Sequence, residues 1–183
     1  MRIIAGKHRS VALASVGKGD AGAQLRPTTD RVRESLFNVL THRDVLEKAV
    51  VLDLFAGTGA LGLEALSRGA ALVTFVENGR ASQRLIAENI ERLRVARDAR
   101  VLRCDARALP RNEGPPATLV FLDPPYGREL GAPALWAADK SGWLAPAACV
   151  IWEEAHPIEP PVGFALADRR RYGDIHITIL DKL

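Results

Sequence analysis

One stretch of the sequence carries side chains that could act together on a substrate, Asp123-Pro124-Pro125-Tyr126. It follows four apolar residues, 119–122, which predict a strand buried on both faces. The two prolines end this strand and fix an extended turn at its carboxyl end, where open α/β sheets bind ligands. The Asp123 carboxylate and the Pro124 carbonyl can accept the two hydrogens of a planar amino group, and Tyr126 can stack on a flat heterocycle. The stretch predicts chemistry on an exocyclic amine; the alternative is a capped strand end with a solvated Asp and a surface Tyr.

A second stretch, Gly57-Thr58-Gly59-Ala60-Leu61-Gly62, fits the G-x-G-x-x-G pattern between a predicted strand and a predicted helix. Its glycines let a ligand approach the backbone closely, and the helix start offers unpaired N–H groups. Glu77 ends the next predicted strand, where a carboxylate can bind both hydroxyls of a ribose. These residues predict an adenosine-containing cofactor, and alone they suit a nicotinamide dinucleotide as well as S-adenosylmethionine.

Two further carboxylates favour S-adenosylmethionine. Asp53, in the strand before the glycines, resembles the acidic residue of methyltransferase motif I near the amino-acid end of the ligand. Asp105 ends the third predicted strand, where such enzymes place a side chain beside the adenine amino group. The alternative for both is a capping role at the adjacent turn or helix.

The elements that must position these residues alternate along the chain. The first predicted helix runs from the start signal at 27–30 to residue 40, and three more are predicted at 63–68, 80–94 and 132–140. Strands are predicted at 50–55, 73–77, 100–105, 117–123, 147–153, 164–170 and 175–180. Only a short turn, 172–174, separates the last two strands, so they must be antiparallel. The pattern predicts an α/β fold, a doubly wound and mostly parallel sheet with one antiparallel edge strand. A basic N-terminal hairpin arm, residues 1–24, is expected to precede the main domain, residues 25–183, with a glycine-rich loop at 17–22.

The charge of this 183-residue chain is uneven, although its net charge is only +3. Residues 1–35 hold seven Lys or Arg against three Asp or Glu, which suggests an anionic partner such as nucleic acid, and from charge alone a solvated basic face is an equal alternative. Arg31 and Arg33 lie off the apolar stripe of their predicted helix, so we expect them to be available to solvent or to a partner. The candidate RNA-contacting residues are Arg2, Lys7, Arg9, Arg26, Arg31, Arg33 and Tyr126.

The composition also bears on where in the cell we expect the protein to act. The mean hydropathy is near zero, no apolar run approaches the length of a membrane span, and the first residues lack the apolar core of a secretory signal. Cys104 and Cys149 are isolated, which predicts free thiols in the cytoplasm and no metal site.

Four segments in order, 2–9, 26–38, 53–59 and 123–126, look like those of the bacterial 16S rRNA guanine-N2 methyltransferases of the RsmD type, and the resemblance covers nearly the whole chain. It implies a Rossmann-like class I methyltransferase fold, S-adenosylmethionine as cofactor, and as substrate a guanine in 16S rRNA within an assembled small subunit. We also expect the protein to be a monomer. The resemblance also implies that Phe37 and Asn38 pack beside the cofactor. With these, the predicted cofactor-binding set is Phe37, Asn38, Asp53, Ala56, Gly57, Thr58, Gly59, Glu77, Asn78, Asp105, Ala106 and Asp123, and the catalytic set is Asp123, Pro124 and Tyr126.

Three other functions remain open from the sequence. A methyltransferase acting on DNA or on a protein glutamine shares the catalytic turn, although DNA enzymes usually carry a recognition domain and glutamine enzymes usually have Asn at the first position of the turn. A dinucleotide-dependent oxidoreductase explains the glycines but not Asp123 to Tyr126. A non-catalytic RNA-binding factor for ribosome assembly explains the basic arm alone.

Overall fold

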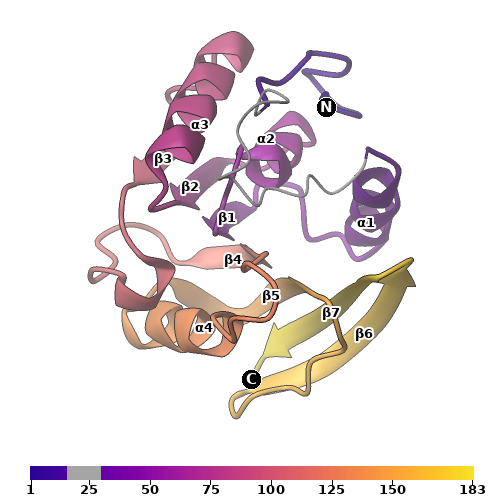
Figure 1. Ribbon diagram of the computed structural model, residues 1–183, viewed down its shortest axis with the longest axis vertical. Helices are drawn as coiled ribbons and strands as arrows, with labels where there is room; N and C mark the ends of the chain where they lie inside the picture. The colour runs from indigo at the N-terminus through magenta and orange to yellow at the C-terminus, as the bar shows by residue number, and fades with distance from the viewer. Residues whose placement is uncertain (16–29) are drawn as a thin grey trace.

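The computed structural model describes residues 1–15 and 30–183, in which seven strands form one sheet with helices on both faces (Figure 1). The strands are β1 (Val50–Leu54), β2 (Leu72–Val76), β3 (Ala99–Leu102), β4 (Ala117–Leu122), β5 (Leu144–Glu154), β6 (Phe164–Tyr172) and β7 (Ile175–Lys182). The helices are α1 (Asp30–His42), α2 (Ala60–Ser67), α3 (Arg80–Leu93) and α4 (Gly131–Lys140), with one 3₁₀ turn, η1 (Ala106–Ala108). In the part of the chain that is described, no helix combines the length and the apolar character that crossing a membrane requires.

The strand order is β3-β2-β1-β4-β5-β7-β6. Strands β1 to β5 pair in parallel, and β7 pairs antiparallel with both β5 and β6. The predicted doubly wound, mostly parallel sheet with one reversed strand is therefore confirmed. The reversed strand is β7, and β6 folds back beside it to become the outermost strand, because the turn between them is too short for a parallel crossover.

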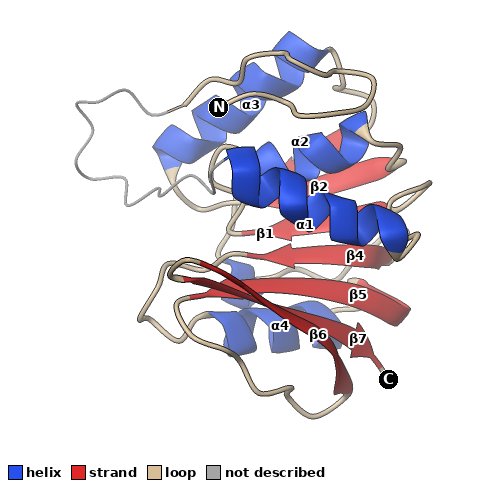
Figure 2. Cartoon of the chain, turned by 90° about the vertical axis from the view of Figure 1, so that its right-hand side faces the viewer, coloured by secondary structure: helices blue, strands red, loops and turns tan. Residues whose placement is uncertain are grey.

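Two apolar layers hold the helices to the sheet. Helices α1, α2 and α3 pack on one face, where Phe37 of α1 meets Phe121 of β4 with ring centroids 5.7 Å apart. Helix α4 and η1 pack on the other face, against alternate residues of the same strands such as Val120 and Leu122. Figure 2 shows α1 in front of the sheet and α4 behind it. Burial on both faces explains why β1 and β4 are almost uninterrupted apolar runs.

The N-terminal residues 1–15 form a hairpin with one isolated bridge, between Arg2 and Ala12, and this hairpin lies on α2. Ile3 is completely buried in the core, and the amides of Ile4 and Ala5 donate to the carboxylate of Glu64 at 2.8 and 3.0 Å. The predicted boundary after residue 24, the loop at 17–22 and the helix start at 27–29 lie outside the described residues.

Gly6 is the point where this hairpin meets α2 most closely. It has φ +81°, and a Cβ atom there would lie 1.8 Å from the carbonyl oxygen of Ser67. We expect Gly6→Ala to lower the free energy of unfolding by about 2–5 kcal/mol, from the unfavourable φ and from a clash with rigid backbone. Thermal unfolding measures the change.

Gly142 supplies the control for that experiment, because it has φ +77° and open space around the position of a Cβ atom. Gly142→Ala should cost only the backbone strain, about 1–2 kcal/mol. Equal losses in the two variants would mean that the hairpin can move away from α2 without cost.

Candidate active site

The predicted site residues lie at the carboxyl edge of the sheet, where the first, second, fourth and fifth strands end together. Asp53 of β1 pairs with Phe121 of β4, so Asp123 extends from β4 directly beside the end of β1. The amide of Asp123 donates to the carbonyl of Leu54 at 3.4 Å. The alternation of strand and helix therefore brings together residues that are seventy positions apart in the sequence.

The glycine loop connects β1 to α2 and is held by a carboxylate from the next strand. Gly57 and Gly59 have positive φ, 57° and 77°, which side-chain-bearing residues adopt at a cost. Glu77 Oε2 accepts from the amide of Gly57 at 2.9 Å, and Glu77 Oε1 accepts from the amide of Gly79 at 2.7 Å. The partly exposed Glu77 is thus fixed against the loop, where a ribose would meet it.

Asp53 is almost completely buried, with 2% of its surface exposed. Its Oδ2 accepts from the amide of Gly62 at 3.0 Å, so it caps the first turn of α2. Burial, and to a smaller extent the charge of Glu77, raise the pKa of Asp53 to about 8. Asp53 therefore does have the capping role that the sequence offered as an alternative, and its titratable carboxyl group lies beside the end of the glycine loop.

The raised pKa makes stability depend on pH. The folded state binds a proton on Asp53 that the unfolded chain releases above pH 4, so this contribution to stability is complete below about pH 4 and is lost as the pH rises to about 8. We expect Asp53→Asn, which keeps an oxygen acceptor for Gly62, to gain stability relative to the parent by up to about 1.4 kcal/mol per pH unit across this range. Melting temperatures from pH 5 to pH 8 test this, and a constant difference between the two proteins would contradict it.

The catalytic turn is surrounded by carboxylates. Asp123 is partly exposed as a residue, but burial of its carboxyl group and the charge of Glu153 raise its pKa well above the usual value, with smaller effects from Asp53 and Glu154. The phenol of Tyr126 donates to Glu153 Oε1 at 2.9 Å, and burial and this neighbour raise the Tyr126 pKa. The edge of the sheet therefore carries a cluster of carboxyl groups beside Tyr126.

Sequence reasoning missed Glu153 and Glu154, the last residues of β5, which are 5% and 4% exposed. The signal was available, because the apolar run 149–152 ends in two acidic residues just as the strand before Asp123 ends in one. Glu153 orients Tyr126, and so it acts on the predicted aromatic residue through a hydrogen bond.

The remaining predicted cofactor residues lie either near the glycine loop or at η1, which follows β3. Ala56 and Thr58 belong to the loop, and Asn78 is exposed directly after Glu77. Asp105 caps η1 through the amide of Arg107 at 2.8 Å, and hydrogen bonds from Arg107 lower its pKa; the neighbouring Ala106 is buried.

The predicted placement of Phe37 and Asn38 beside the cofactor stays a prediction. Phe37 is completely buried between Phe121 and the guanidinium of Arg68. Asn38 is exposed and lines a groove between α1 and β6. Helix α1 runs from the carboxyl edge of the sheet, where Ser35 meets Tyr172, toward the amino edge, where Arg43 meets Asp181.

The N-terminal hairpin is joined to the cofactor loop by the buried side chain of Asn89 from α3. Its Nδ2 donates to the carbonyls of Ala14 at 3.2 Å and Thr58 at 3.0 Å, and its Oδ1 accepts from the amide of Ala14 at 2.7 Å. The Thr58 hydroxyl also lies 3.9 Å from the sulfur of Met1. The hairpin therefore braces the loop directly.

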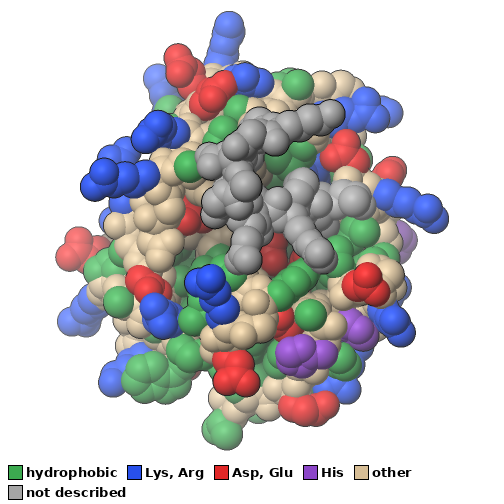
Figure 3. Space-filling view, in the orientation of Figure 1, with side chains coloured by type: hydrophobic (Ala, Val, Ile, Leu, Met, Phe, Trp, Pro, Cys, Tyr) green, Lys and Arg blue, Asp and Glu red, His purple; other side chains and the backbone are tan. Residues whose placement is uncertain are grey.

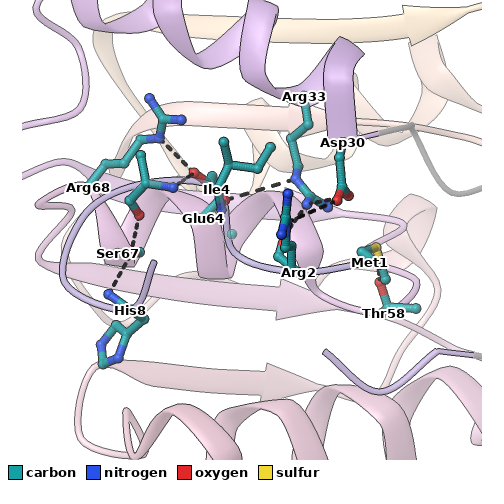
Figure 4. A network of polar contacts seen from close by, with 12 residues as sticks. Met1, Arg2, Ile4, His8, Asp30, Arg33, Thr58, Glu64, Ser67 and Arg68 are labelled. Atoms are coloured by element: carbon teal, nitrogen blue, oxygen red, sulfur yellow. Dashed lines mark hydrogen bonds and ion pairs between the residues drawn. The ribbon is translucent and has the colours of Figure 1, made fainter. Parts of the chain in front are cut away.

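Four of the predicted RNA-contacting cations are exposed: Arg2, Lys7, Arg9 and Arg31. Arg26 lies outside the described residues. The expectation that Arg33 is available to a partner is wrong, because it is 1% exposed and its guanidinium bonds to the carbonyl of Arg2 and to Asp30 at 3.1 Å, with Glu64 4.0 Å away (Figure 4). Burial lowers the Arg33 pKa. Arg33 is a structural cation under the hairpin.

Comparisons with known proteins agree with this geometry. The family model described as "Conserved hypothetical protein 95" matches residues 1–181. The chain is 46% identical over 129 residues to ribosomal RNA small subunit methyltransferase D of Escherichia coli strain K12, a match that covers 70% of this chain and 64% of that relative. It is 35% identical to the protein of the same name from Haemophilus influenzae, with 94% of this chain and 89% of the relative covered. The solved structure of the putative methyltransferase yhhF from Escherichia coli superposes with a TM-score of 0.85 at 37% identity, covering 100% of this chain and 97% of that one.

A more distant structure supports the fold alone. An RNA methyltransferase from Salinibacter ruber, solved in complex with S-adenosyl-L-homocysteine, is 18% identical and superposes with a TM-score of 0.66, over 85% of this chain and 93% of that one. The sheet, the glycine loop and the carboxyl groups at the carboxyl edge of the sheet thus occur in a chain that the family model matches over residues 1–181. The chain belongs to that family, the RsmD type.

Proposed function

We propose that this protein transfers a methyl group from S-adenosylmethionine to the exocyclic N2 of a guanine in 16S rRNA, within the small ribosomal subunit and in the cytoplasm, and that it acts as a monomer. The observation that carries the proposal is the position of Asp123 at the carboxyl edge, beside the end of β1 where the glycine loop begins, and close to Tyr126, whose hydroxyl donates to Glu153. The names of the relatives, ribosomal RNA small subunit methyltransferase D, support the choice of RNA.

The site fits a cationic, adenosine-containing cofactor. Gly57 and Gly59 carry no side chains and adopt positive φ, so a ligand can approach the backbone of the loop, and Glu77 stands where ribose hydroxyls would bind. Burial, and to a smaller extent neighbouring carboxylates, raise the pKa values of Asp53 and Asp123, and a bound cation would favour the ionised form of both groups. S-adenosylmethionine supplies such a cation and, on its sulfonium, an activated methyl group.

The amine needs orientation more than activation. The N2 lone pair of guanine is delocalised into the ring, so holding the nitrogen in line for attack can lower the barrier by roughly 7–11 kcal/mol. In our proposal the Asp123 carboxylate and the Pro124 carbonyl accept its two hydrogens and direct the lone pair out of the ring plane. These hydrogen bonds strengthen as positive charge develops on nitrogen.

Tyr126 and Glu153 complete the arrangement. The ring of Tyr126 stacks on the guanine, and the hydrogen bond to Glu153 keeps the ring in one orientation. The exposed Arg2, Lys7, Arg9 and Arg31 bind phosphates of the RNA. The surplus proton leaves the nitrogen through Asp123 or water after the methyl group has been transferred.

The test is methyl transfer from labelled S-adenosylmethionine to four substrates in parallel: small subunits that lack the modification, naked small-subunit rRNA, duplex DNA and a release-factor protein. Label in small subunits that maps to guanine N2 is the expected result. Label confined to DNA or protein would overturn the substrate, and binding of S-adenosylmethionine without any label would favour a non-catalytic assembly factor.

A further inference from the structure

Three consecutive arginines, Arg169, Arg170 and Arg171, are exposed on β6, the outermost strand, and the candidate active site uses none of them. We propose that Arg170 and Arg171 form a second rRNA-binding surface, which holds phosphates of the strand that leads away from the target guanine. This inference rests on the proposed function and adds a second point of contact to it.

The register of the sheet places these arginines level with the catalytic turn. Glu153 of β5 pairs with Ile177 of β7, which pairs with Arg170 of β6. In the same way, Glu154 is in line with Arg171 through His176. Since neighbouring strands are spaced by about 4.8 Å, the backbone of the two arginines lies about 10 Å from the end of β5 and about 14 Å from the end of β4. Their side chains leave this outermost strand on opposite faces, with Arg170 on the side of α1, so together they flank the edge of the sheet. A few nucleotides of single-stranded RNA span that interval.

Cations at the sides of the site would attract the phosphates of the RNA strand. In their ionised forms, the carboxylates around Asp123 repel the phosphates of the strand whose base must enter. The N-terminal hairpin lies over α2 on one side of the turn, and the β6–β7 hairpin lies on the other (Figure 1). Lys and Arg side chains project all around the outline of the molecule (Figure 3), so it is the register with the catalytic turn that singles out this pair.

The arginines are also free to exchange partners while their strand is held in place. Arg170 Nε lies 2.8 Å from Asp168, and Arg171 Nε donates to the carbonyl of Gly173 at 2.9 Å. Exposed pairs of this kind contribute little, so a phosphate can replace them. At the end of β6 the hydroxyl of Ser35 donates to that of Tyr172 at 3.0 Å, which fixes the strand to α1.

The double variant Arg170→Gln/Arg171→Gln tests the surface, with Arg94→Gln/Arg97→Gln as the matched control. Arg94 and Arg97 are exposed and follow α3 at the amino edge of the sheet, so the control removes the same charge far from the turn. We measure binding of labelled small-subunit rRNA from about 50 to 200 mM salt, and the KM and kcat for methylation of small subunits. Melting temperature and affinity for S-adenosylmethionine verify that each variant is folded.

The expected result is a salt dependence of log Kd that is shallower by about one unit per phosphate contact, so by up to about two units in the test variant. The KM for the particle should rise at least about tenfold with little change in kcat, and Arg170→Lys/Arg171→Lys should restore most of the salt dependence. A test variant that behaves like the control, beside a parent that methylates small subunits, would overturn the second surface alone. A parent that neither binds rRNA nor methylates small subunits would overturn both this surface and the proposed function.

Discussion

Replacing Asp123 by alanine is expected to lower kcat for methyl transfer by about 10²–10³ while S-adenosylmethionine still binds, because the variant loses the acceptor that orients the reacting amine. The glycine loop, Asp53 and Glu77 remain in place to hold the cofactor. Single-turnover methylation of small subunits and isothermal titration with S-adenosylmethionine separate the two effects. Loss of cofactor binding in the alanine variant would contradict the assigned role.

Asp123→Asn is the matched control, since it keeps an oxygen acceptor and removes the charge. We expect it to retain more activity than the alanine variant. The two proteins should also differ in pH dependence: the raised pKa of Asp123 means that the parent gains its acceptor as the pH rises, whereas the asparagine variant should lose this dependence. A parent rate that is independent of pH through this range would show that Asp123 is already ionised in the complex with both substrates.

Replacing Glu64 by alanine is expected to cost about 3–5 kcal/mol of stability, far more than the loss of a charge from a surface ion pair. Glu64 is completely buried, and its carboxylate accepts from the amides of Ile4 and Ala5 and from Arg68 Nε at 2.7 Å. Its removal leaves these donors unpaired and leaves Arg33 with Asp30 as its remaining acidic neighbour among the described residues. Urea unfolding gives the free energy, and hydrogen exchange at Ile4 and Ala5 locates the damage.

Glu88→Ala is the comparison for this experiment. Glu88 also pairs with an arginine four residues on, Arg92, but both side chains are nearly half exposed. The expected loss is therefore below about 1 kcal/mol. Similar losses in the two variants would mean that the buried cluster around Glu64 contributes no more to the free energy of unfolding than a surface ion pair does.

Much of the architecture could be predicted because the relevant signals are local. The apolar runs at β1 and β4 and the short turn before β7 follow directly from residue type and spacing. The sequence predicts the fifth strand from residue 147, whereas β5 begins at Leu144, because Pro146 and the positive φ of Ala147 interrupt the pattern without ending the strand. The register shift between β4 and β5 lies at the same place.

The error at Arg33 concerns a side chain whose partner is distant in the sequence. Arg33 is off the predicted apolar stripe of α1, yet it is buried because Glu64, thirty-one residues later, provides a carboxylate inside the fold. Periodicity reports which residues share a face but not what covers that face, and so it could not reveal this contact.

The hairpin at residues 1–15 is held in place by residues that are synthesised well after it. The amide of Ile4 donates to Glu64, sixty residues later, and the amide of Ala14 donates to Asn89, seventy-five residues later. At a synthesis rate of about 5–20 residues per second, this hairpin remains without its partners for at least about 3 s, with the apolar Ile3 uncovered. Burial of the hairpin therefore depends on α2 and α3, and a chain that stops before residue 60 leaves uncovered a segment that longer chains bury.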